Sequence, residues 1–178
     1  MTSLPQQSPR VNVHATSVVL SNAAAPFGAA LDAAVLLVGA SGAGKSDVAL
    51  RLIGMGAKLI SDDQTALFVQ EGRLFAGAPD TIRTRMEIRG AGIVGLDAAP
   101  PAPVVLAVRL DPDAEIPRMP EPAHHALPHG LKGCAEPPFI ILRPFEASTP
   151  AKIAATASAI ARGAFVAGVV SPSSDPFF

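Results

Sequence analysis

The chain has 178 residues, of which 49% are hydrophobic and 16% charged, a composition typical of one globular domain with tails. Its net charge of −1 and sequence pI of about 6.4 exclude the basic surface that binds nucleic acid or anionic membranes, so we expect neither as a partner. The single cysteine, Cys134, excludes a disulfide framework and a cysteine-rich zinc site, and it is typical of a reducing cytoplasm.

The beginning of the chain predicts a flexible arm followed by a β-hairpin. Residues 1–10 are polar and proline-containing, and they lack the basic-then-apolar pattern of a targeting segment. Residues 11–20 (VNVHATSVVL) are rich in β-branched side chains and predict a strand. Residues 29–38 (AALDAAVLLV) predict its hairpin partner, which continues into the core.

Residues 39–46 (GASGAGKS) follow this apolar run and match the pattern G-x-x-x-x-G-K-[ST]. Glycines let consecutive backbone N–H groups turn toward one anion, and a following helix adds its positive N-terminal end. We expect that helix to begin near Lys45 and to end at Gly56, with Val48, Leu52 and Met55 on its apolar face. The nucleotide-binding residues predicted here are Gly39, Ala40, Ser41, Gly42, Ala43, Gly44, Lys45 and Ser46. Lys45 would reach the β- and γ-phosphates, and the Ser46 hydroxyl would bind Mg²⁺.

An acidic pair follows the next apolar run, in KLISDD (58–63). A nucleotide-binding site of this kind needs a carboxylate for Mg²⁺, and adjacent side chains at a strand end point in opposite directions. Asp62 is therefore a candidate metal ligand and Asp63 a candidate base facing the nucleophile, although such a pair can also serve only as a turn. Since no N-K-x-D guanine-reading motif occurs, ATP is favoured over GTP.

Residues 66–79 predict a hairpin with a Glu-Gly turn, and residues 86–96 (MEIRGAGIVGL) begin extended and then become rich in glycine. Glu87 and Arg89 alternate with apolar residues, so the two charges share one strand face. Glu87 is a candidate Mg²⁺ ligand, and Arg89 is a candidate for neutralising charge on a transferring phosphoryl group. The alternative is a solvated strand face followed by a loop.

The remaining chain predicts two buried strands, 104–110 and 139–143, joined by a proline-rich loop or lid. Residues 150–163 predict a helix with Ser148 or Thr149 as its cap, and residues 164–178 a mobile tail. The apolar stretch 153–170 contains Arg162 and many alanines, so we interpret it as a helix and tail rather than a membrane span. His124, His125 and His129 are interpreted as a solvated loop, since no acidic or cysteine partner completes a metal site beside them.

Three segments in this order, GASGAGKSDVAL, LISDD and MEIRGAGIVGLD, resemble the HPr kinase/phosphorylase family, the bacterial serine kinases of the phosphotransferase system. The resemblance covers roughly residues 11–160 and corresponds to the catalytic domain alone, as in the short forms of alphaproteobacteria. It implies an α/β fold in which a P-loop kinase domain (11–163) has a central mixed sheet and flanking hairpins. It further implies ATP and Mg²⁺ as cofactors, HPr or a related phosphocarrier as substrate, a cytoplasmic location and a homohexamer.

The resemblance also implies roles for individual residues. Asp63 matches the family's proton acceptor, which donates the proton in the reverse reaction, and Glu87 matches a Mg²⁺ ligand. His14 matches the active-site histidine, and Arg118 is the best candidate for an active-site arginine. The family's Pro-Val-x-Pro-Gly-Arg segment is replaced by ILRPFEAS (141–148), which leaves the reverse phosphorolysis open.

The sequence therefore predicts an ATP- and Mg²⁺-dependent serine kinase acting on HPr or a related protein. Two alternatives stay open at this point. One is a small-molecule kinase built on the same loop, against which residues 86–96 argue. The other is a nucleotide-sensing module without enzymatic activity.

Overall fold

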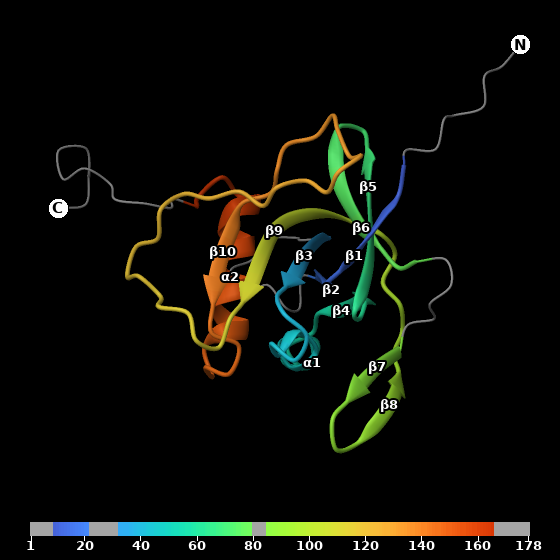
Figure 1. The fold of residues 1–178 in the computed structure, drawn as a ribbon, viewed down its shortest axis with the longest axis vertical. Coiled ribbons are helices and arrows are strands. Elements are labelled where there is room, and N and C mark those ends of the chain that lie inside the picture. The colour runs from blue at the N-terminus through green and yellow to red at the C-terminus, as the bar shows by residue number, and fades with distance from the viewer. Residues whose placement is uncertain (1–8, 22–31, 80–84, 166–178) are drawn as a thin grey trace, which may run out of the picture.

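The computed structural model describes residues 9–21, 32–79 and 85–165 of the chain. These residues form a mixed eight-stranded sheet, a separate two-stranded hairpin and two helices (Figure 1). The strand order is β1-β5-β6-β9-β3-β2-β4, with β10 also paired to β9. The α/β class, the central mixed sheet and the flanking hairpins are as predicted.

The elements follow one another along the chain with these bounds: β1 Val11–His14, β2 Thr16–Leu20, β3 Ala33–Val38, α1 Lys45–Gly54, β4 Lys58–Ser61, β5 Gln64–Gln70, β6 Arg73–Gly77, β7 Arg85–Ile88, β8 Gly92–Gly95, β9 Ala102–Leu110, β10 Phe139–Leu142 and α2 Thr149–Ala161.

The single strand predicted for residues 11–20 is in fact two strands that change partners at Ala15. β1 pairs antiparallel with β5, whereas β2 lies between β3 and β4. The break is fixed by polar contacts to β5, since the Thr65 hydroxyl donates to the Ala15 carbonyl at 2.9 Å and lies 2.9 Å from the Ser17 hydroxyl. Consequently the end of β1 and the start of β2 both lie beside the turn that joins β4 to β5.

The strand directions bring four segment ends to one edge of the sheet. β3 runs parallel to β9, and β9 runs parallel to β10. β4 has the same direction as β3, because both pair antiparallel with β2. The segments that follow β3, β4, β9 and β10 therefore meet at the carboxyl edge of the sheet, where ligands of open α/β sheets bind.

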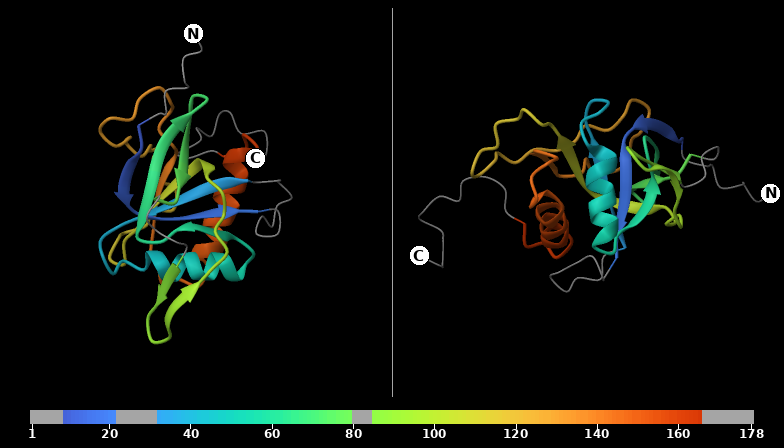
Figure 2. Two further views of the ribbon diagram at one scale, coloured as in Figure 1. Left: turned by 90° about the vertical axis from the view of Figure 1, so that its right-hand side faces the viewer. Right: turned by 90° about the horizontal axis from the view of Figure 1, so that it is seen from below.

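Both faces of the central strands are covered, as the apolar runs predicted. Val35 and Leu37 of β3 pack with α1 and α2, whereas Ala34 and Leu36 pack on the opposite face with residues of β5 and β6. Two side views show α1 and α2 side by side on one face (Figure 2). Strands buried on both faces hold the carboxyl edge in a fixed geometry.

The β5–β6 hairpin has the predicted Glu-Gly turn. Glu71 and Gly72 have φ angles of 50° and 70°, the left-handed pair that suits the twist of a two-residue hairpin. The segment between β9 and β10 is a loop, as predicted, with one bridge between His124 and Pro138.

Two details of the helices differ from the sequence-based expectation. Met55 lies just beyond α1 and is 37% exposed, so it does not extend the apolar face of Val48 and Leu52. Ser148 occupies the N-cap position of α2, as predicted, but its side chain forms no capping hydrogen bond, and the Thr149 hydroxyl donates to the Arg143 carbonyl at 2.6 Å.

Neither described helix has the length and apolarity that crossing a membrane requires. Most of the predicted arm (residues 1–10) and tail (residues 164–178) lies outside the described residues, as do residues 29–31 of the predicted strand 29–38, and the division into arm, domain and tail stays a prediction.

The contrast within α1 can be tested by truncation. Leu52→Ala removes a fully buried side chain from the core and should lower the free energy of unfolding by about 2–5 kcal/mol in urea titrations. Met55→Ala, the matched control, should cost less than about 1 kcal/mol. Equal losses in the two variants would contradict the assignment of the helix face.

Candidate functional site

A cavity of about 570 Å³ lies at the carboxyl edge of the sheet. The loop 39–46, the turn after β4 and the β7–β8 hairpin all contribute to its walls. A second cavity, of about 440 Å³, shares His14 and Asp63 with it and is otherwise lined by β1 and Gln64. The structure thus brings together most of the residues that the sequence singled out.

The loop 39–46 requires glycine at two positions for space as well as for conformation. Gly39 and Gly44 have φ angles of 149° and 82°. A Cβ atom at Gly39 would lie 2.6 Å from the Leu110 carbonyl oxygen, and one at Gly44 would lie 2.9 Å from the Pro144 Cβ. The loop is therefore a closely packed turn leading directly into α1, a geometry that fits a bound phosphate chain.

Lys45 is the first residue of α1 and folds back across the loop. Its side chain is buried, and its Nζ donates to the carbonyl oxygens of Gly39 at 3.0 Å and Ala40 at 2.9 Å. Burial lowers the pKa of Lys45, and the negative charges of Asp63 and Asp62 partly oppose that shift. The ammonium group is thereby held at the centre of the loop, where a phosphate would meet it.

The Asp62 carboxylate joins the loop to the sheet. Its Oδ1 accepts hydrogen bonds from the Ser46 hydroxyl at 2.8 Å, the Thr16 hydroxyl at 2.8 Å and the Asp63 backbone N–H at 3.1 Å. Sequence reasoning missed Thr16, which is fully buried, because a lone threonine in a strand carries no recognisable motif. Ser46 and Asp62, two of the predicted Mg²⁺ ligands, are in direct contact.

Asp63 points to a different partner. Its Oδ1 lies 2.9 Å from His14 Nε2, and both side chains are open to solvent, at 75% and 48% exposure. The two carboxylates contact different partners, but strand alternation does not separate them: both residues lie beyond the end of β4, and Asp63 has a left-handed φ of 65°. Such a conformation is uncommon for a non-glycine residue and is concentrated at functional sites.

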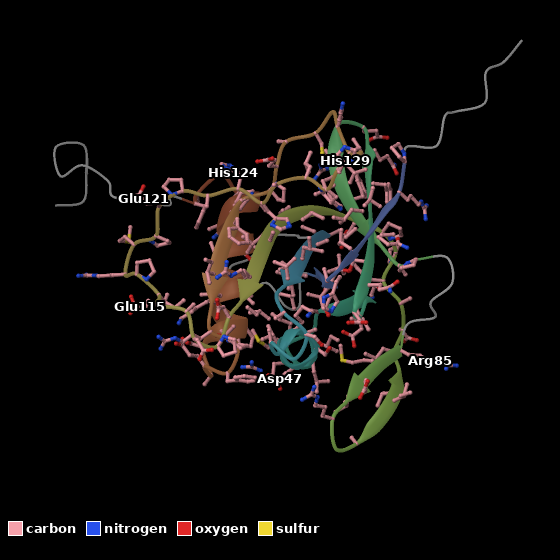
Figure 3. The ribbon with its side chains drawn as sticks, viewed as in Figure 1. Asp47, Arg85, Glu115, Glu121, His124 and His129 are labelled. Atoms are coloured by element: carbon pink, nitrogen blue, oxygen red, sulfur yellow. The ribbon has the colours of Figure 1, made fainter. Side chains whose placement is uncertain are left out.

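Glu87 and Arg89 reach the same cavity from the β7–β8 hairpin. The buried Met86 beside them packs in the same hydrophobic core as Val48 and Leu52 of α1, and this packing holds the hairpin against the domain. Arg118 lies in the β9–β10 loop and is not among the residues that line the cavity. In Figure 3 that loop, with Glu115 and Glu121, is on one side of Asp47, and Arg85 at the start of the hairpin is on the other.

A magnesium ion with a nucleotide fits these donors better than a metal held by protein alone. Among the described residues, no group of three or more His, Cys, Asp or Glu side chains could hold a metal ion. Mg²⁺ is commonly held by one or two carboxylates together with substrate phosphates and water. Asp62, Ser46 and Glu87 match that pattern in chemistry.

His125, one of the three histidines in the β9–β10 loop, stacks its ring on the Phe139 ring with 5.5 Å between the ring centroids, and burial lowers the pKa of His125.

Residues 24–99 match the model of the family described as HPr Serine kinase C-terminal domain. The HPr kinase/phosphorylase of Lactobacillus acidophilus is 49% identical over 61 residues, which are 34% of this chain and 19% of that protein. The HPr kinase/phosphorylase of Limosilactobacillus reuteri is 35% identical over 92 residues, or 51% of this chain and 26% of that protein.

A solved structure, the Hpr(Ser) kinase/phosphatase from Coxiella burnetii, superposes with a TM-score of 0.60 at 23% identity. The superposition covers 86% of this chain and 89% of that chain, and it shows a shared fold. The matched segments span only about a fifth to a quarter of the two curated relatives. The resemblance read from the sequence is confirmed, for the C-terminal (catalytic) domain of that family.

The packing of the loop leads to a stability prediction. Gly44→Ala introduces both a left-handed alanine and a close approach to Pro144, so it should lower the free energy of unfolding by about 2–4 kcal/mol. Gly42→Ala is the matched control, because Gly42 has a similar φ of 79° and no atom within 4 Å of the added Cβ. It should cost only about 1–2 kcal/mol in the same denaturant titration. Equal costs would show that Pro144 does not press on the loop.

Proposed function

We propose that the chain is an ATP- and Mg²⁺-dependent protein serine kinase acting on HPr or a related phosphocarrier. The match of residues 24–99 to the HPr Serine kinase C-terminal domain model supports this proposal. The observation that supports this most directly is the divergence of Asp62 and Asp63. One carboxylate is bound to the hydroxyl of the loop, and its neighbour faces the solvent-open side of the same cavity.

The loop 39–46 would hold the phosphate chain through its backbone N–H groups, the Lys45 ammonium and the N-terminus of α1. Ser46 and Asp62 would hold Mg²⁺ on one side, and Glu87 would complete its protein ligands from the hairpin. The metal supplies charge neutralisation for the transferring phosphoryl group. Because Thr16 and Ser46 both donate to one oxygen of Asp62, the carboxylate is oriented before a ligand arrives.

Asp63 would act as the general base. Its carboxylate takes the proton of the acceptor serine as the serine oxygen bonds to the γ-phosphorus and the bond to the leaving diphosphate breaks. His14 orients this carboxylate through the 2.9 Å contact. Of the two candidate arginines, Arg89 lines the cavity and Arg118 does not, so Arg89 is the one proposed to offset developing charge.

The oligomeric state, the cellular location and the substrate of the protein are inferred from the family resemblance alone. A homohexamer, a cytoplasmic location and the phosphocarrier substrate belong to this proposal. The reverse phosphorolysis depends on the segment after β10, where Pro144 is present and the family's Gly-Arg is replaced.

The acceptor can be tested with purified chain, γ-labelled ATP, Mg²⁺ and HPr. Label on an HPr serine supports the proposal. Label on a metabolite supplied from a cell extract would instead indicate a small-molecule kinase, and ATP binding without transfer to either would indicate a nucleotide sensor.

The role of Asp63 gives a sharper prediction. Asp63→Asn removes the base but keeps the size of the side chain, so kcat should fall by about 10²–10⁴-fold while ATP affinity stays within a few-fold of the wild type. Steady-state kinetics and calorimetric ATP titration measure the two quantities. Asp113→Asn, on an exposed loop outside the cavity, is the control and should leave both unchanged. Wild-type turnover in Asp63→Asn would remove Asp63 as the base.

A further inference from the structure

Phe145 presents an exposed aromatic ring to the cavity. Phe145 is 65% exposed, and it is the one exposed phenylalanine among the described residues. The chain has no Trp or Tyr. Large apolar side chains are usually withdrawn from solvent, so an exposed ring in the wall of a ligand cavity needs an explanation.

The sheet order places Phe145 across the loop from the two aspartates. β10 lies beyond β9 on one side of β3, whereas β4 lies beyond β2 on the other side (Figure 1). Phe145 follows β10, and Asp62 and Asp63 follow β4. The ring is close to the loop, since a Cβ atom on Gly44 would be 3.2 Å from Phe145 Cε1 and 3.3 Å from its Cζ.

The backbone around Phe145 is held by side chains of both helices. Arg51 of α1 donates to the carbonyl oxygens of Pro144 and Glu146, on either side of Phe145. Lys152 of α2 forms an ion pair with the Glu146 side chain at 2.7 Å. The ring therefore projects from a backbone that is already fixed, which lowers the entropic cost of binding a ligand against it.

We propose that Phe145 is the platform on which the nucleobase of the bound nucleotide stacks, an inference that rests on the proposed kinase function. The phosphate end of the nucleotide is assigned to Lys45 and the aspartate side of the loop, so its base extends toward the opposite wall. That wall carries the exposed ring of Phe145, a flat apolar face on which a base can stack. Stacking on an aromatic ring accepts any base, so the site selects nucleotides over bare polyphosphates without reading the purine edge.

The test compares ligands with and without a base. Affinities of Mg²⁺-ATP and Mg²⁺-tripolyphosphate are measured by calorimetry for the wild type, Phe145→Ala and Met119→Ala. The ratio of ATP affinity to tripolyphosphate affinity should fall about 10-fold in Phe145→Ala. It should be unchanged in Met119→Ala, which truncates an apolar side chain that is 50% exposed and lies outside the cavity. An unchanged ratio in Phe145→Ala overturns the proposal.

A fluorescent reporter provides a second measurement, because the chain contains no tryptophan. In Phe145→Trp, saturating ATP should quench the single indole and tripolyphosphate should not, while Met119→Trp should respond to neither ligand. Equal responses of Phe145→Trp to both ligands overturn the stacking assignment. A raised KM for HPr with an unchanged affinity ratio would also overturn it and would assign Phe145 to the protein acceptor.

The failure of this inference can be told apart from the failure of the proposed function. If both ligands bind and Lys45→Ala lowers the affinity for both, the assignment of the phosphate site to the loop stands, whatever the effect of the Phe145 substitutions. If neither ligand binds the wild type, the phosphate site and the stacking platform are overturned together.

Discussion

The site depends on one carboxylate oxygen, Oδ1 of Asp62. It accepts hydrogen bonds from a hydroxyl of β2, a hydroxyl of α1 and a backbone N–H of its own turn. Hydrogen bonds to a charged acceptor are each worth about 1.5–3 kcal/mol net, and removing the acceptor leaves the buried Thr16 hydroxyl without this bond. This oxygen therefore fixes the positions of β2, the loop 39–46 and the turn after β4 relative to one another.

These segments lie together because the sheet brings parts of the chain that are far apart in the sequence to one edge. β3 supplies the loop, β4 the aspartates and β10 the segment with Pro144 and Phe145, and all three strands run in the same direction. Since β3 is covered on both faces, the edge cannot shift without disturbing the core. The geometry of the loop and the spacing of its neighbours thus follow from the same packing.

The sequence predicted those features that local pattern encodes. Alternation and apolar runs located the strands, glycine spacing located the loop, and the Glu-Gly pair located the β5–β6 turn. It did not predict the break at Ala15, the burial of Thr16 or the conformation of Asp63. These depend on contacts between residues about fifty positions apart, such as Thr65 with Ala15, which no local periodicity records. Met55 was wrongly assigned to the apolar face because helical spacing continues past the point where the helix ends.

The charged residues of the site are supported unequally. Asp62 and Lys45 are held by several hydrogen bonds within the main domain, whereas Glu87 and Arg89 lie on a two-stranded hairpin that pairs with no other strand of the described residues. Such a hairpin is marginally stable by itself, so its position depends on Met86, which is 1% exposed and packs against α1. Ile93 of β8, by contrast, pairs with Glu87 and is 71% exposed. The loop and Asp62 are therefore preorganised, and the charges on the hairpin are the part of the site that can adjust when a ligand enters the cavity.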